Sequence, residues 1–158
     1  VNYILIARQE RHRVYQFFTG DFLSRCICLV FFLVYPTTNT RPVIEGNGIW
    51  DLLAGWLYSI DAADNLFPSI HCLVSWFCYL GIRGRKEIPR WYQSVSMVIA
   101  ILVFASTLLT KQHVIVDVAG GILLAEFCFF IGRKTDLYRI YERFGSRIEQ
   151  KIRRLTEG

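Results

Sequence analysis

The sequence predicts an all-α integral membrane protein: a helical bundle with about four transmembrane helices, an interfacial helix and a cytoplasmic amphipathic tail. Of its 158 residues, 53% are hydrophobic, and the mean hydropathy is +0.33, whereas an average soluble domain is roughly 45–50% apolar. Long apolar stretches alternate with short basic clusters, a pattern typical of proteins that cross a bilayer. We expect a membrane domain over residues 1–132 and a basic tail over residues 133–158.

Four apolar segments of 17 to 22 residues predict the spans, because about 20 helical residues cross roughly 30 Å of hydrocarbon. The segments cover residues 14–35, 66–82, 91–109 and 114–132. In the first span Asp21 and Arg25 are four residues apart, so on a helix they would pair on one face. The first seven residues are too few to span, and we expect them to be the end of a helix that begins before residue 1.

The basic residues orient these spans. They gather before the first span, between the second and third, and after the fourth, in segments 7–13, 83–90 and 133–134. The positive-inside rule places these segments on the cytoplasmic side and therefore puts residues 36–65 and 110–113 on the outer side. The same rule accounts for the net charge of +5, so we expect no nucleic-acid partner. The five cysteines lie within apolar segments and are interpreted as buried hydrophobic residues, not as disulfide or zinc sites.

The long outer segment 36–65 is predicted to contain an amphipathic helix. Its apolar side chains recur at helical spacing, at Ile49, Trp50, Leu53, Trp56, Leu57 and Ile60, with Asp51, Ser59 and Asp61 between them. One interpretation is an interfacial helix whose tryptophans lie at headgroup depth. The other is a loop folded back over the bundle.

The tail, residues 133–158, carries eight bases and four acids. It also has an apolar stripe of helical spacing, formed by Leu137, Ile140, Tyr141, Phe144, Ile148, Ile152 and Leu155. This pattern predicts a cytoplasmic amphipathic helix on anionic lipid. A packing contact with a partner chain is the alternative.

Polar residues from three distant segments are predicted to meet on the outer side of the membrane. They are Arg41, Ser69, His71, Lys111, His113 and Asp117. His113 and Asp117 are four residues apart at the start of the fourth span, so a helix would place them on one face. A carboxylate that holds one imidazole nitrogen fixes the tautomer and makes the other nitrogen a better nucleophile or base. The alternative is a helix-end histidine with an incidental carboxylate.

The remaining members of this group suit a bound anion. Pro68 fits the first position of a helix, Ser69 offers a hydroxyl, and the free backbone amides of that turn favour a negative group with His71 beside it as an acid. Arg41 precedes a proline that holds its backbone extended, and a guanidinium clamps phosphate through two hydrogen bonds. Lys111 is either a further cation of the site or an ordinary interfacial anchor.

Together these residues meet the needs of phosphoryl transfer through a phosphohistidine. Such a reaction needs a nucleophilic histidine with its carboxylate, a second histidine that protonates the leaving oxygen, and cations for the developing charge. A metal site formed by His71, His113 and Asp117 is the rival interpretation. It lacks further cysteine or carboxylate ligands on that face.

These motifs resemble the type 2 phosphatidic acid phosphatase superfamily, whose pattern is K-x6-R-P, then P-S-x-H, then S-R-x5-H-x3-D. Residues 41–42, 68–71, Ser106 and 113–117 match this pattern in order, within about residues 20–132. The resemblance implies a helical membrane bundle without a metal cofactor. It also implies a role for each matching residue: nucleophile for His113, its partner for Asp117, general acid for His71, and phosphate ligands for Arg41 and Ser69.

The sequence departs from the superfamily pattern at two cations. Val34 stands where the lysine is expected, and Thr107 stands where the arginine is expected. Lys111, two residues before His113, is a candidate replacement for one of them. The branch of the superfamily that makes sphingolipids by transferring a phospho-headgroup likewise tolerates other residues at these two cation positions. It keeps the histidines and the aspartate.

Three functions are consistent with these residues. The leading hypothesis is a phosphatase that hydrolyses a lipid phosphomonoester or diphosphate, with that lipid phosphate and the membrane lipids as its partners. The second is a phospho-headgroup transferase similar to inositol phosphorylceramide or sphingolipid synthases. The third is a lipid-binding membrane protein that has lost catalysis. The expected location is a plasma membrane of bacterial type, with the active site on the extracytoplasmic face.

Overall fold

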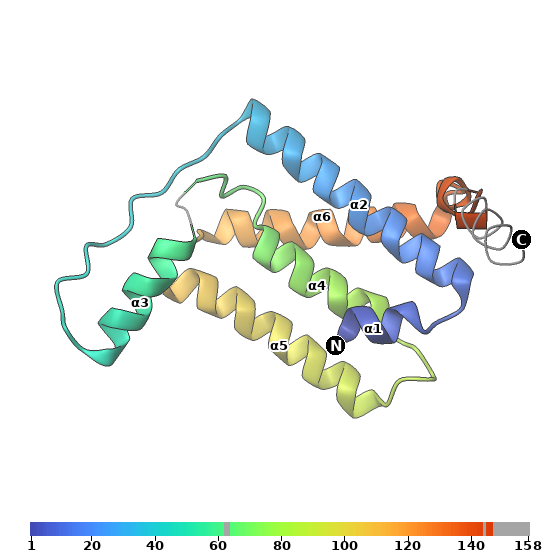
Figure 1. The fold of residues 1–158 in the computed structure, drawn as a ribbon, viewed down its shortest axis with the longest axis horizontal. Helices are drawn as coiled ribbons and strands as arrows, with labels where there is room; N and C mark the ends of the chain where they lie inside the picture. The colour runs from blue at the N-terminus through green and yellow to red at the C-terminus, as the bar shows by residue number, and fades with distance from the viewer. Residues whose placement is uncertain (62–63, 144, 147–158) are drawn as a thin grey trace, which may run out of the picture.

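The computed structural model describes residues 1–61, 64–143 and 145–146, and these residues confirm the predicted all-helical fold (Figure 1). One isolated β-bridge, between Thr38 and Asp64, is present in this part of the chain. The helices are α1 (Asn2–Ala7), α2 (Arg11–Val34), α3 (Ile49–Ile60), α4 (Ile70–Ile82), α5 (Arg90–Leu109) and α6 (Ile115–Lys134).

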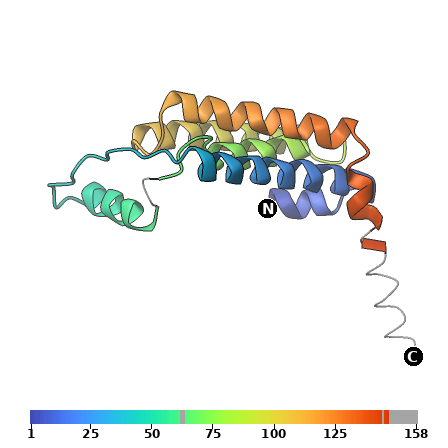
Figure 2. The same cartoon turned by 90° about the horizontal axis from the view of Figure 1, so that it is seen from above.

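Helix α4 is the centre of the bundle. It packs against α5 and α6 and also contacts α1 and α2, while α2 packs along α6 (Figures 1 and 2). The fully buried Phe77 of α4 meets Phe17 of α2 and Phe129 of α6, with ring centroids 5.2 and 5.8 Å apart. Edge-on aromatic contacts of this kind contribute beyond the area they bury, so these rings tie the three helices together.

Within the described residues, three helices, α2, α5 and α6, are long and apolar enough to cross a membrane. The fourth predicted span, over residues 66–82, is not among them, because α4 has 13 residues and so rises only about 20 Å. Residues before it are held outside the helix: the Thr37 hydroxyl accepts the backbone N–H groups of Leu66 and Phe67, at 2.9 and 3.1 Å. The bilayer core is roughly 30 Å thick, so α4 falls short of it by length.

Helix α3 confirms the amphipathic helix predicted in the outer segment. It lies away from the bundle as a separate arm, in green in Figure 1, and none of its residues is buried. Trp50 and Trp56 are 80% and 63% exposed. The Tyr58 hydroxyl donates to the Thr110 carbonyl at 2.8 Å and so links α3 to the end of α5. A location of α3 at the membrane interface stays a prediction.

Two further predictions concern charged segments. Asp21 and Arg25 do pair on one face of α2, with Nε and Oδ2 3.1 Å apart. In the tail, residues 138–143 and 145–146 are helical. The rest of its predicted apolar stripe, Phe144, Ile148, Ile152 and Leu155, lies outside the described residues.

Close contact between α2 and α6 depends on Gly132. A Cβ atom there would lie 2.5 Å from the Gln16 carbonyl oxygen and 3.0 Å from the Gly20 nitrogen. We predict that Gly132→Leu separates the two helices and lowers the stability in detergent by about 1–3 kcal/mol, as overpacking does. Thermal unfolding of the purified protein measures the effect. Ala119→Leu, on an exposed position of the same helix, should leave the unfolding temperature unchanged.

Candidate active site

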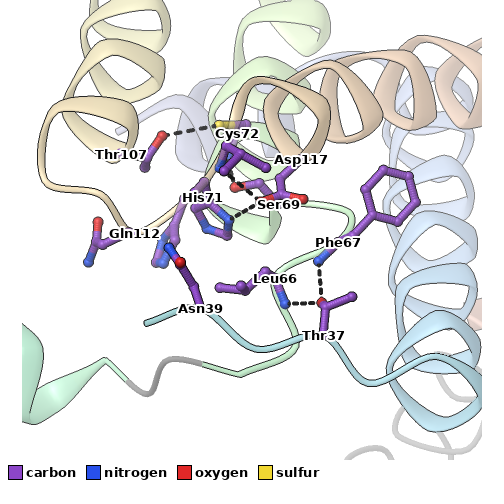
Figure 3. A network of polar contacts seen from close by, with 12 residues as sticks. Thr37, Asn39, Leu66, Phe67, Ser69, His71, Cys72, Thr107, Gln112 and Asp117 are labelled. Carbon is purple, nitrogen blue, oxygen red and sulfur yellow. Dashed lines mark hydrogen bonds and ion pairs between the residues drawn. The ribbon is translucent and has the colours of Figure 1, made fainter. Parts of the chain in front are cut away.

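Ser69, His71 and Asp117, three of the residues predicted to carry chemistry, lie together at one end of the bundle, where α4 and α6 begin and α5 ends (Figure 3). A cavity of about 310 Å³ lies there. It is lined by both predicted catalytic histidines and by Phe32, Asp61, Asp64, Asn65, Leu66 and Ile70.

Ser69 fixes the start of α4. Its Oγ accepts the Cys72 backbone N–H at 3.4 Å, so Ser69 is the N-cap, and Pro68 lies outside the helix, not at its first position as predicted. The Ser69 N–H donates to the Asp117 carbonyl at 3.1 Å and joins α4 to α6. Gly121 permits this approach, since a Cβ there would lie 2.6 Å from the Ser69 carbonyl oxygen. Ser69 itself is fully buried.

His113 and Asp117 come together as predicted, although His113 precedes α6 instead of lying in its first turn. Helix α6 begins at Ile115, and Asp117 caps it by accepting the Val114 N–H at 3.0 Å. The same carboxylate oxygen lies 3.4 Å from His113 Nδ1. The alignment is not that of a hydrogen bond, since Nδ1 has no hydrogen-bond partner. The carboxylate is therefore placed to stabilise a positive charge that develops on this imidazole.

The turn between α5 and α6 positions His113. The Thr107 carbonyl accepts the backbone N–H groups of both Gln112 and His113, at 3.0 and 3.1 Å. Thr107, which stands where the resemblance expects an arginine, is buried, and its Oγ1 lies 3.7 Å from Cys72 Sγ of α4 (Figure 3). Lys111 is exposed in this turn, with φ of +52°, and its carbonyl accepts Asn39 Nδ2 at 2.9 Å. The backbone of the turn is thus tied to both α5 and the outer loop.

The second predicted catalytic residue, His71, faces His113. It is the second residue of α4, and its ring centroid is 5.9 Å from that of His113. Its side chain is 50% exposed, compared with 7% for His113. Both imidazoles line the cavity, and that of His71 is far more exposed than that of His113.

Arg41 is engaged by Asp61, a residue for which the sequence analysis gave no role in the site. Its Nη2 lies 3.0 Å from Asp61 Oδ2, its Nη1 donates to the Asp61 carbonyl, and its guanidinium lies 4.8 Å from the Tyr58 ring centroid. Asp61 also accepts a hydrogen bond from Gln112 Nε2 at 2.8 Å and lies 3.6 Å from His71 Nε2. The signals in the sequence were slight: Asp61 follows an apolar helix, and Gln112 precedes His113.

A family model described as the PAP2 superfamily matches residues 1–131. The chain belongs to the PAP2 superfamily. No curated protein and no solved structure matches it. Membership indicates a lipid-related function of the phosphatase or phosphotransferase type, and together with the three long apolar helices it indicates an integral membrane protein. Of the two cation positions that depart from the pattern of this superfamily, Thr107 is buried near the end of α5 and Val34 is 78% exposed at the end of α2.

Burial sets the electrostatics of His113 in this PAP2 chain. Loss of hydration lowers the pKa of His113 below its usual 6.5, because burial disfavours the charged imidazolium. The Asp117 carboxylate opposes this shift, His71 adds to it and Asp61 opposes it more weakly. The net effect keeps His113 neutral at pH 7, which is the form a nucleophile needs.

We predict that the His113 imidazole titrates below pH 6.5 and that Asp117→Asn lowers its pKa further, because the opposing negative charge is removed. Asparagine keeps an oxygen that can cap α6, so the fold should be retained. NMR of protein carrying ¹⁵N-labelled histidine measures both values. Titration of the wild-type imidazole at or above 6.5 would contradict the assignment of burial as the dominant effect.

Proposed function

We propose that the chain is a metal-independent membrane phosphatase that hydrolyses a lipid phosphomonoester or diphosphate through a phosphohistidine intermediate. The observation that carries the proposal is the pair of facing imidazoles, 5.9 Å apart between centroids, at a cavity of about 310 Å³. One is buried beside a carboxylate and the other is half exposed, so their environments suit a nucleophile and a proton donor respectively.

In the first step, His113 Nε2 attacks the phosphorus atom. A P–N bond forms as the bond between phosphorus and the lipid oxygen breaks, and the proton of His71 passes to that leaving oxygen. Positive charge develops on the imidazole of His113, and Asp117, 3.4 Å from Nδ1, stabilises it. The products of this step are the dephosphorylated lipid and a phosphohistidine.

In the second step, His71 acts as a base. It takes a proton from water, whose oxygen attacks phosphorus while the P–N bond breaks. Inorganic phosphate leaves, and both histidines return to their starting protonation states. Water reaches the site from the side of His71, whose side chain is 50% exposed.

Groups at the start of α4 and in the outer loops are proposed to bind the phosphate. The resemblance assigns this role to Ser69 and Arg41, and Lys111 offers a cation close to His113 in sequence. Arg41 contacts Asp61, and a guanidinium is a natural bidentate partner of phosphate. The apolar lining at Phe32 and Ile70 suits the lipid part of the substrate.

The decisive experiment uses purified protein in detergent with phosphatidic acid and, separately, undecaprenyl diphosphate. We predict release of inorganic phosphate that persists in EDTA and stops with vanadate. His113→Ala should abolish release and the acid-labile phosphoprotein formed from ³²P-labelled substrate, because the nucleophile is lost. His12→Ala, at the opposite end of α2, is the matched control and should retain both.

Other outcomes of this assay distinguish the alternatives. Headgroup that appears on added ceramide or diacylglycerol, in place of free phosphate, would make the chain a transferase. Full activity of His113→Ala would overturn the nucleophile assignment. The absence of any product with every lipid and acceptor would favour a lipid-binding protein without catalysis.

We predict that Lys111→Ala raises the KM for phosphatidic acid by roughly tenfold, the equivalent of about 1.4 kcal/mol of binding, because a phosphate-binding cation is lost. Lys86→Ala removes the same charge from the loop between α4 and α5, at the other end of the bundle, and should leave KM unchanged. An unchanged KM for Lys111→Ala would show that this lysine does not replace a missing cation.

A further inference from the structure

We propose that Asp61 is a positioning residue that orients the imidazole of His71 for proton transfer to the leaving group. The inference rests on the proposed function, in which His71 is the general acid. It adds to that site a residue outside the three motifs that carry the family resemblance. Asp61 lies directly after α3, ten residues before His71.

The Asp61 carboxylate bridges three separate segments. Its Oδ1 lies 3.6 Å from His71 Nε2 of α4. Its Oδ2 contacts Arg41 Nη2 of the loop before α3 at 3.0 Å and accepts Gln112 Nε2 of the turn before α6 at 2.8 Å. Two firm contacts through one oxygen leave the other oxygen directed to the imidazole, so the position of the carboxylate is set independently of His71.

A carboxylate in this position selects the tautomer of the imidazole. When it accepts the hydrogen on Nε2 of the imidazolium, Nδ1 carries the proton to be transferred, and after the transfer the neutral ring keeps its hydrogen on Nε2. Contacts of this kind often lengthen in the free enzyme and tighten when substrate binds, so 3.6 Å is compatible with the role. Each histidine then has a carboxylate beside one ring nitrogen, Asp61 at Nε2 of His71 and Asp117, 3.4 Å away, at Nδ1 of His113.

The proton balance of the first step is unchanged by Asp61. The proton on His71 Nδ1 moves to the lipid oxygen as the P–O bond breaks, and the hydrogen on Nε2 stays with the pair formed by His71 and Asp61. In the second step Nδ1 takes a proton from water. Asp61 neither gains nor loses a proton, and its contribution is the orientation of the ring.

The role is tested by comparing the loss of kcat for substrates with different leaving groups. A defect in general-acid catalysis is large when the leaving oxygen needs a proton and small when it does not. We predict that Asp61→Asn lowers kcat for phosphatidic acid by roughly 100-fold, the lower range for general-acid catalysis. For p-nitrophenyl phosphate, whose phenolate leaves with little protonation, the loss should be less than tenfold. Equal losses in kcat for the two substrates, or a change confined to KM, would overturn the proposal.

Two further variants separate positioning from a general structural effect. In a His71→Ala background, Asp61→Asn should cause no further loss of kcat, since Asp61 acts through His71; an additional tenfold loss would contradict this. Glu45→Gln removes the same charge from an exposed site in the loop before α3 and should leave kcat unchanged. Bound vanadate and thermal unfolding report whether each variant keeps the folded site.

A measurement without turnover distinguishes failure of this inference from failure of the proposed function. In ¹⁵N-histidine spectra, Asp61→Asn should shift the ring nitrogens of His71 and Glu45→Gln should not. Unchanged His71 nitrogens would overturn the positioning role even in an active phosphatase. Shifted nitrogens in a protein that releases no phosphate would support the positioning of His71 and contradict hydrolysis as the function.

Discussion

The hydrogen bond from the Ser69 amide to the Asp117 carbonyl joins the first turns of α4 and α6, and the site depends on this junction. It brings His71 and His113 to 5.9 Å between ring centroids although the two are 42 residues apart in sequence. Gly121 makes the junction sterically feasible, because any side chain there would meet the Ser69 carbonyl. The distance between the two histidines, the proposed acid and nucleophile, is therefore set by backbone contacts.

The outer segment completes the site from outside the bundle. Helix α3 buries none of its own residues, yet its end supplies Asp61, which contacts Arg41, His71 and Gln112. An arm with exposed apolar side chains is suited to rest on lipid. Its polar contacts link the position of Asp61 in the candidate site to this exposed apolar surface.

Charged groups within the spans are paired away from the site. Arg25 holds Asp21 through two hydrogen bonds, at 3.1 and 3.2 Å, and Glu126 accepts hydrogen bonds from Trp76 and Arg83. Unpaired charges in hydrocarbon are costly, so these contacts stabilise helices that carry polar residues. They account for Asp21, Arg25 and Glu126 as structural groups, distinct from those that line the cavity.

Hydropathy, charge placement and residue type by themselves determined the all-helical membrane class, an amphipathic helix within residues 36–65, and the pairing of His113 with Asp117, because these depend on local sequence. Tertiary structure alone decided that α4 begins only at Ile70, since Thr37 holds the backbone before it. It also decided the contacts of Asp61, whose partners come from three segments. No periodicity or motif predicts these contacts, because they form only when elements distant in sequence pack together.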